Sequence, residues 1–314
     1  CSSLTQITIP SSVETIEPLA FYECKSLRQV SFEANSSLSV IDKSVFNGCL
    51  SLTQIIIPNS VTFIGCHAFS GCASLAQITI PYSVTYIGNS AFLNCTSLMQ
   101  ITIPSSIKSI EDSTFLGCTT LTQVTIPSSV SSIGEGAFLN CYLLIDIVIP
   151  CSVTIIKNRT FRKCMTLRRL TIPDSITSIG SFSFAGCASL SHIIIPSSVK
   201  SIGDNAFDGC SSLLDISIPS SVTSIGNFIF YGCTLLTDIS IPPSITTIGN
   251  HVFTGCTSLT NLSIPSSITS IGNYAFSGCT SLLQFKIPNH VVSIGHYAFQ
   301  GCSSLKQVEI PSSV

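Results

Sequence analysis

The cysteines of this chain recur at a fixed interval, which constrains the fold more than any other sequence feature. Fourteen of the 16 cysteines are separated by steps of 23 residues, with a single step of 25 residues between Cys24 and Cys49. A fixed period of roughly 20–50 residues is typical of solenoids, propellers and repeat arrays. The interval predicts thirteen complete units from Cys1 to Gly301 and a fourteenth that stops at Val314. We call each unit a coil and number its positions from the repeat cysteine.

The consensus of one coil is C-x-S-L-x-x-I-x-I-P-x-S-V-x-x-I-G-x-x-A-F-x-G, as in residues 256–278. Its L-x-x-L-x-L spacing predicts a strand that ends at the proline, because proline has no N–H for a ladder. A second extended segment follows, and Ala275 and Phe276 are expected in a short helical turn. Position 23 is Gly in nine coils and Asn at Asn94 and Asn140. Exchange of Gly with Asn predicts a left-handed residue that closes this turn. The second coil differs, since it has two extra residues near Asn35 and lacks the proline.

The combination I-P-x-S-V-x-x-I-G-x-x-A-F-x-G-C resembles the BspA-like, or Treponema pallidum-type, leucine-rich repeat family over the whole chain. The resemblance implies a right-handed, horseshoe-like α/β solenoid. Its parallel sheet would lie on one face, with short helical turns and the second extended segment on the others. It also implies a kinship with surface proteins of mucosal bacteria and parasitic protozoa, several of them adhesins. We expect residues 1–314 to form a single solenoid domain that is an excerpt of a longer chain.

Composition agrees with a solenoid and narrows the classes of partner. Only 9% of residues are charged and the formal net charge is −2, which does not favour nucleic acid as a partner. Mean hydropathy is +0.56, yet no run approaches the roughly 18 apolar residues of a membrane-spanning helix. Stacked coils explain both values: each coil buries apolar side chains, and like charges in register would repel one another.

The sequence carries no pattern of catalysis or of cofactor binding. The five histidines lack metal-ligand spacing, and no phosphate loop or nucleophile motif occurs. We therefore expect no enzyme activity, no cofactor and no metal site. The repeat cysteines are expected to be reduced and buried, whereas Cys66 and Cys151 fall outside the repeat positions and should be exposed free thiols.

Two features break the regularity of the surface and are the candidate partner-binding residues. The first is a basic cluster in which Lys157 and Lys163 stand where most coils have glycine. It favours either a solvated patch or a site for an anionic partner. The second is an aromatic ridge at position 19 in the C-terminal half, which favours either packing between coils or a contact surface. The candidate residues are Lys157, Arg159, Arg162, Lys163, Arg168, Arg169, Phe228, His251, Tyr274 and Tyr297.

Two functions remain open at this point. The first is a non-enzymatic adhesion or host-interaction protein, located at the cell surface or secreted, that binds a protein or glycan on another cell or matrix. The second is a cytoplasmic or assembly-bound scaffold that uses the solenoid as a spacer, and two free thiols in a reducing compartment would agree with it.

Overall fold

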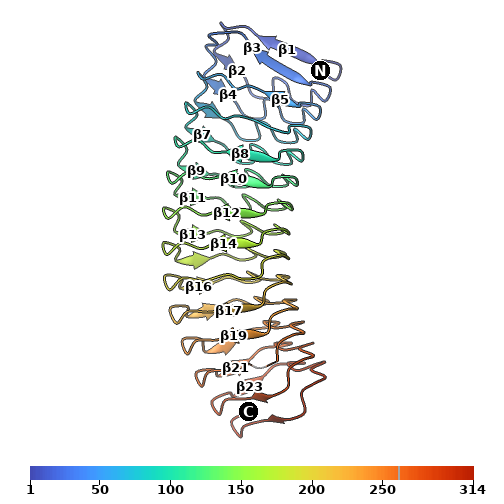
Figure 1. Ribbon diagram of the computed structural model, residues 1–314, viewed down its shortest axis with the longest axis vertical. Coiled ribbons are helices and arrows are strands. Elements are labelled where there is room, and N and C mark those ends of the chain that lie inside the picture. Colours follow the sequence, from blue (N-terminus) through green and yellow to red (C-terminus); the bar gives the residue numbers. More distant parts are fainter. Residues whose placement is uncertain (261) are drawn as a thin grey trace. The chain divides into compact units, whose positions relative to one another are not determined.

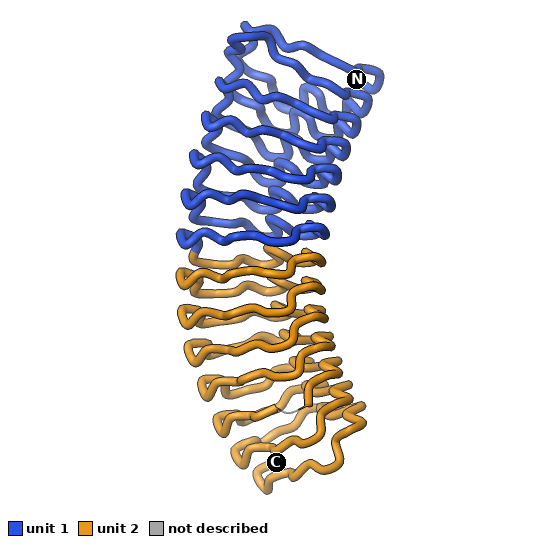
Figure 2. The backbone as a smooth tube through the Cα atoms, viewed as in Figure 1, with its two compact units in different colours: residues 1–153 blue, residues 154–314 orange. Residues whose placement is uncertain are grey.

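The computed structural model describes residues 1–260 and 262–314, and the chain divides into two compact units, residues 1–153 and 154–314 (Figure 2). Within each unit, successive coils stack on one another through parallel strands in register (Figure 1). Each coil contributes two extended segments, so that two rows of short strands run along each stack. Both units are therefore parallel β-solenoids of 23-residue coils, as the repeat predicts.

In unit 1 the first row joins β1, β3 and β5 in one sheet and β8 and β10 in another. The pairing is residue for residue, so Gln6, Gln29 and Gln54 lie side by side. The first-row strands of unit 1 are β1 (Gln6–Ile9), β3 (Gln29–Phe32), β5 (Gln54–Ile55), β8 (Gln100–Thr102), β10 (Gln123–Thr125) and β12 (Asp146–Val148). Its second-row strands are β2 (Thr15–Ile16), β4 (Val40–Ile41), β6 (Phe63–Ile64), β7 (Tyr86–Ile87), β9 (Ser109–Ile110) and β11 (Ser132–Ile133).

Unit 2 repeats this arrangement. Its first-row strands are β14 (Arg169–Thr171), β17 (Asp215–Ser217), β19 (Asp238–Ser240), β22 (Phe285–Lys286) and β24 (Val308–Glu309). Its second-row strands are β13 (Ile155–Ile156), β15 (Ser178–Ile179), β16 (Ser201–Ile202), β18 (Ser224–Ile225), β20 (Thr247–Ile248), β21 (Ser270–Ile271) and β23 (Ser293–Ile294). The first row is less regular than the second, since His192 forms only an isolated bridge with Asp215 and residues 262–264 form no strand.

The core of each unit is built from rows of identical side chains. Phenylalanines at position 21 are fully buried from Phe46 to Phe276, and their rings stack in parallel. The ring centroids of Phe69 and Phe92, for example, lie 5.5 Å apart with an interplanar angle of 2°. Leucine at position 4 and the Ile or Val at positions 13 and 16 fill the rest of each coil. Because each coil is too thin to enclose a core alone, its apolar side chains become buried only when coils stack.

The short helical turn expected around Ala275 and Phe276 is not found, and no helix occurs in the described part of the chain. The N–H groups at positions 19, 21 and 23 donate to the next coil, as Asn205 does to the carbonyl of Asn227 at 2.9 Å. The N–H at position 22 closes a turn within its own coil, as Asp208 does to the carbonyl of Asn205 at 3.2 Å. Backbone N–H groups that alternate between coils cannot complete the i→i−4 bonds of a helix. We call this segment the corner.

The repeat cysteines are free thiols, and the twelve from Cys24 to Cys279 are buried. The thiol of Cys72, which begins the fourth coil, donates to the carbonyl of Phe46 near the end of the second coil at 3.2 Å, and most repeat cysteines make the equivalent contact. Cysteine is thus both a small core residue and a donor that joins coils. Cys1 is exposed and Cys302 half-buried, so burial holds for twelve of the fourteen repeat cysteines and not for all of them.

Serine and threonine hydroxyls form further rows of hydrogen bonds between coils. Serine at position 12 donates to the carbonyl of position 13 in the preceding coil, as Ser83 does to Val61 at 2.6 Å and Ser198 to Ile176 at 2.6 Å. Threonine at position 14 makes a similar bond, as Thr85 does to Thr62. The Thr62 carbonyl also accepts from the N–H of Thr85 at 2.8 Å, so the threonine hydroxyl adds a second bond to it. Neutral hydroxyls therefore supply hydrogen bonds between coils without charge, which agrees with the high Ser and Thr content of a weakly charged chain.

Candidate partner-binding surface

Position 19 of each coil forms a continuous row along the corner of unit 2. The row runs through seven coils, and its residues have φ of 55–57°. We call it the corner row: Arg159, Phe182, Asn205, Phe228, His251, Tyr274 and Tyr297. The left-handed backbone at position 19 follows from the same corner that places position 23 in this conformation.

Large side chains in the corner row are unfavourable for the backbone. A left-handed conformation suits Gly and Asn and costs energy for other residues. The chain has Gly136 at this position in unit 1 and Asn205 in unit 2, so Gly and Asn, the residues that suit a left-handed backbone, are both compatible with the corner. Aromatic rings at Phe182, Phe228 and Tyr274 are therefore not explained by the backbone, and strained positions of this kind often mark functional sites.

The rings of the corner row stack face to face along the unit. Ring centroids lie 4.4 Å apart for Phe228 and His251, 4.7 Å for His251 and Tyr274, and 5.0 Å for Tyr274 and Tyr297. Phe228, His251 and Tyr274 are half-buried, whereas Tyr297 is 60% exposed. Packing between coils, one of the two alternatives for this ridge, is thus present. It covers the ring faces and leaves ring edges at the surface.

The basic residues of the seventh coil adjoin this row. The guanidinium carbon of Arg162 lies 5.0 Å from the ring centroid of Phe182, and that of Arg159 lies 5.9 Å from it. Both distances are within the range of cation–π interactions. Arg159 belongs to the corner row itself, and Lys163 is exposed at position 23 with φ of 61°. Two features that are separate in the sequence, the basic cluster and the aromatic ridge, meet at Phe182.

Position 22 adds neighbours that the sequence did not single out. Tyr231, which is 43% exposed, lies with its ring centroid 6.1 Å from that of Phe228. Burial raises the pKa of the Asp208 carboxyl, and a hydrogen bond from Asn205 and the charge of Arg162 oppose this shift. Alignment of the coils by position would have found both residues, because position 22 is next to the corner row on the surface.

His251 is stacked between two rings, and desolvation lowers its pKa. The imidazole is therefore neutral near pH 7, and its Nδ1 lies 3.3 Å from Oγ1 of Thr254. The four residues of the corner row from Phe228 to Tyr297 therefore carry no charge at that pH. The corner row thus has a basic end at Arg159 and a neutral aromatic end at Tyr297.

Arg168 and Arg169 lie elsewhere, so the structure divides the basic cluster between two faces of the coil. Arg169 begins β14 in the first strand row, and with Arg168 it lines a hollow of about 780 Å³. Asp174 and His192 also line this hollow. Lys157, at position 17, is exposed between the corner and the second strand row.

Beyond this hollow the strand row becomes acidic. Nδ1 of His192 lies 3.3 Å from Oδ1 of Asp215, and Asp215 pairs in register with Asp238. Two carboxylates side by side repel one another, and here both are exposed to solvent, which screens them. Arg169, His192, Asp215 and Asp238 therefore give the strand face of unit 2 a charge pattern that the Gln rows of unit 1 lack.

Within residues 1–260 and 262–314, no group of three or more His, Cys, Asp or Glu side chains is arranged to hold a metal ion. The same residues contain no helix that is long and apolar enough to cross a membrane.

Comparison with known proteins gives a consistent result. A family model described as the BspA type leucine rich repeat region (6 copies) matches residues 1–98, 39–168, 154–283 and 202–314. A leucine-rich repeat protein from Bacteroides ovatus is 32% identical, with a TM-score of 0.77, over the whole of this chain and 80% of its own. No curated protein matches the chain.

Two other solved structures are also similar. A leucine rich cell surface protein from Faecalibacterium prausnitzii is 29% identical, with a TM-score of 0.58, over 98% of this chain and 79% of its own. A leucine-rich repeat protein from Eubacterium ventriosum is 22% identical, with a TM-score of 0.59, over 99% of this chain and 91% of its own. The second of these supports the fold alone.

Proposed function

This chain belongs to the family of BspA-type leucine-rich repeat proteins, and on that premise we propose that it is a cell-surface adhesion protein that binds its partner through the corner row of unit 2. Leucine-rich repeat solenoids are protein-interaction modules, so binding rather than catalysis is the general role. The finer assignment concerns the place where it acts, the residues that bind and the class of partner.

One observation carries the choice of surface. The corner row places aromatic and Arg side chains on backbone that favours Gly or Asn, and it does so in six of seven consecutive coils. Aromatic and Arg side chains supply most of the energy at protein interfaces, and rigid rings lose little entropy on binding. The stack holds its rings in place before a partner arrives, which lowers the cost of association.

The location at the cell surface rests on kinship. The structure from Faecalibacterium prausnitzii is named a leucine rich cell surface protein and is 29% identical over nearly the whole chain. A partner on another cell or in the surrounding matrix, either a protein or a glycan, follows from that location. Antibodies against the chain should therefore label intact source cells, and labelling only after permeabilisation would instead favour the cytoplasmic scaffold.

The scaffold alternative has one observation in its favour. Cys151 is an exposed free thiol and Cys66 is partly exposed, and free thiols persist most readily in a reducing compartment. In that case the solenoid would act as a spacer, and the corner row would contact another part of the assembly.

The binding surface is tested with beads that carry residues 1–314 and are allowed to adhere to cultured epithelial cells. The triple variant Phe228→Gly, Tyr274→Gly and Tyr297→Gly removes three rings while it suits the left-handed backbone. We expect it to abolish adhesion at both low and high salt. The matched control is Ser90→Gly with Ser113→Gly, which makes the same backbone change at position 19 of unit 1 and should leave adhesion intact.

The two basic groups are tested separately because they lie on different faces. Arg159→Asn, Arg162→Gln and Lys163→Asn together should weaken adhesion in a salt-dependent manner, as screening of charges requires. Arg168→Gln with Arg169→Gln should have a smaller effect, since both side chains lie on the strand face. Adhesion that survives the loss of the rings and of the first basic group would contradict the proposal.

A further inference from the structure

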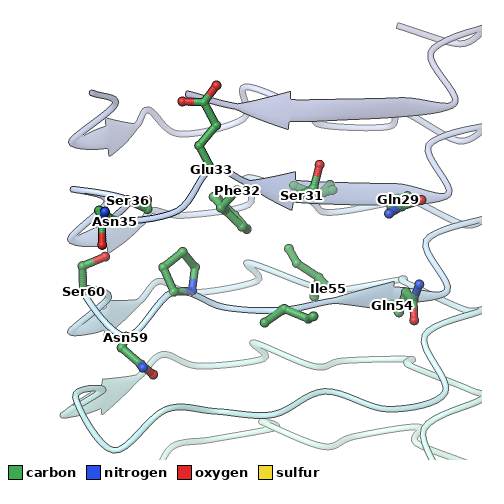
Figure 3. A pocket seen from close by; sticks show the side chains of 13 residues that line it. Gln29, Ser31, Phe32, Glu33, Asn35, Ser36, Gln54, Ile55, Asn59 and Ser60 are labelled. Carbon is green, nitrogen blue, oxygen red and sulfur yellow. The ribbon is translucent and has the colours of Figure 1, made fainter. Parts of the chain in front are cut away.

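The second coil, which is the irregular one, opens a pocket in unit 1. It has two more residues than the others and lacks the proline of position 10. A cavity of about 440 Å³ lies between this coil and the third coil, in the first strand row (Figure 3). This volume is in the usual range of small-molecule sites, and it is far smaller than a macromolecular interface requires.

The pocket forms because the segment around the insertion remains hydrogen-bonded to the first coil and loses its pairing with the third. β3 pairs with β1 over four residues but with β5 over only two, Gln29 with Gln54 and Val30 with Ile55. Further along, the N–H of Glu33 donates to the carbonyl of Ile9 at 3.1 Å. The Glu33 carboxylate in turn accepts from the N–H of Ser11 at 2.9 Å.

The third coil regains contact with the second only beyond the insertion. After Ile55, the next backbone hydrogen bond from the third coil to the second, among the described residues, runs from Thr62 to Ser39 at 2.9 Å. The intervening segment turns instead to the fourth coil, where Ile56 bridges to Thr79. The gap therefore results from the two extra residues in the second coil, which separate its backbone from that of the third coil.

The gap leaves one hydroxyl group without a partner. Ser60 occupies position 12, where serines of regular coils such as Ser83 and Ser106 donate to the preceding coil. The Oγ of Ser60 is buried and makes no hydrogen bond within the described chain. An unpaired buried hydroxyl is costly, so a ligand that satisfies it gains binding energy.

Apart from Glu33, the other polar side chains of the lining are neutral and can both donate and accept. Figure 3 shows Asn35 and Ser60 facing each other at one end of the gap and Gln29 and Gln54 at the other, with Phe32 between them. Amide side chains and hydroxyls pair with groups that are themselves donors and acceptors. Phe32 is only half-buried and offers an apolar face. Glu33, the one ionisable residue of the lining, points away from the gap toward the first coil.

We propose that this pocket binds an uncharged saccharide. Sugar hydroxyls both donate and accept, as the amides of Gln29 and Gln54 and the hydroxyl of Ser60 require, and the C–H face of a sugar ring packs on Phe32. A lining without a cation disfavours sulfated or carboxylated sugars. The site lies wholly in unit 1 and does not rest on the function proposed for unit 2.

The experiment titrates glucose, galactose, mannose and N-acetylglucosamine separately into residues 1–314 labelled at isoleucine methyl groups. We expect at least one sugar to give saturable shifts at Ile55 and Ile56, with a Kd of roughly 1 mM. Ser60→Ala and Asn35→Ala should each weaken this binding at least tenfold. Ser83→Ala is the matched control, since it removes the hydroxyl of a regular coil and should leave binding unchanged.

Three results would overturn the proposal. The first is the absence of saturable shifts for all four sugars up to about 50 mM, which would exclude even weak binding. The second is binding that persists unchanged in both pocket variants, which would place the sugar elsewhere. The third is glucuronate binding more tightly than glucose, which would show that the site prefers an anion.

Discussion

Two positions in each coil hold a left-handed residue, and different residues fill them. Position 23 is Gly or Asn in eleven of thirteen coils, whereas position 19 accepts Ser, His, Arg and aromatic residues. The backbone preference is the same at both, so the difference concerns what surrounds the side chain. A Cβ atom on Gly209 would lie 3.7 Å from the Cα atom of Gly186 in the neighbouring coil, whereas several side chains at position 19 are rings that stack face to face on those of the neighbouring coils.

The left-handed assignment at position 23 is tested by paired variants of Gly209. A Cβ atom there would meet neighbours only at ordinary contact distance, so φ of 67° decides the outcome. Gly209→Asn should change the free energy of unfolding little, and Gly209→Val should lower it by about 1 kcal/mol or more, because a β-branched residue fits this region poorly. Urea denaturation measures both. Equal stability of the two variants would contradict the assignment.

The state of the cysteines is tested by alkylation of the native chain followed by mass spectrometry. Cys1, Cys66 and Cys151 should react, Cys302 should react slowly, and the twelve buried thiols should react only after denaturation. Burial raises the pKa of Cys118 and Cys187 to about 12, so these thiols stay protonated and unreactive near neutral pH. Rapid alkylation of either one in the native chain would show that the thiol row is open.

At the scale of the coil, stability comes from rows of identical contacts between neighbours. Backbone bonds at the corner and serine hydroxyls at position 12 connect one coil to the next. Each thiol that bonds to a Phe carbonyl connects the start of one coil to the end of the coil two before it. The second coil interrupts only the rows near its insertion, and the second-row strands β2, β4 and β6 remain paired across it. The solenoid therefore tolerates an irregular coil because several rows run independently.

Two serines at position 12, Ser83 and Ser60, are expected to contribute differently to stability, because only Ser83 forms the hydrogen bond to the preceding coil. Ser83→Ala removes a bond to the carbonyl of Val61 and should lower the free energy of unfolding by about 1 kcal/mol. Ser60→Ala removes a buried hydroxyl that has no partner and should be neutral or slightly stabilising. Thermal unfolding of the two variants makes the comparison. A larger loss for Ser60→Ala would mean that its hydroxyl has a structural partner.

The strands and the left-handed turn are evident in the sequence, because each is set by a residue type that recurs at one position. The surface exceptions are evident as departures from that recurrence. The corner is different. Ala and Phe before Gly are typical of a helical turn, and only the neighbouring coil, which accepts every second N–H, prevents it. The division of the basic cluster had the same origin, since residues close in sequence, such as Lys163 and Arg168, belong to different faces of the coil.

At the scale of the whole molecule, buried thiols make stability depend on alkaline pH. A thiol has a pKa of about 9 when exposed, and burial raises it to about 12 at Cys118 and Cys187. Below pH 9 the folded and unfolded chains are both protonated and stability is complete. As pH rises from 9 toward 12, only the unfolded chain loses protons, and stability falls.

The size of this effect predicts cooperative unfolding in base. Burial raises the pKa of ten of the buried repeat thiols. Each of them costs about 1.4 kcal/mol at pH 10, and together they cost about 14 kcal/mol, which is close to the upper end of the roughly 5–15 kcal/mol by which most proteins are stable. Circular dichroism under reducing conditions should show unfolding within about one pH unit above 9. The variant Cys118→Ala with Cys187→Ala should lose less stability between pH 8 and 9.5, by roughly 1.5–2 kcal/mol. A chain that stays folded at pH 10.5 would contradict the prediction.

The in-register pairing of coils has a consequence for inheritance. Because Gln6 lies beside Gln29 and Gln100 beside Gln123, each regular coil offers the next one the same edge. Loss or duplication of one entire coil by unequal recombination would leave both flanking coils correctly paired, with no side chain exchanged between core and surface. We therefore expect related genes to differ in length by whole coils. The second coil, with its two extra residues, would identify the same place in each of them, so that coils could be counted from it.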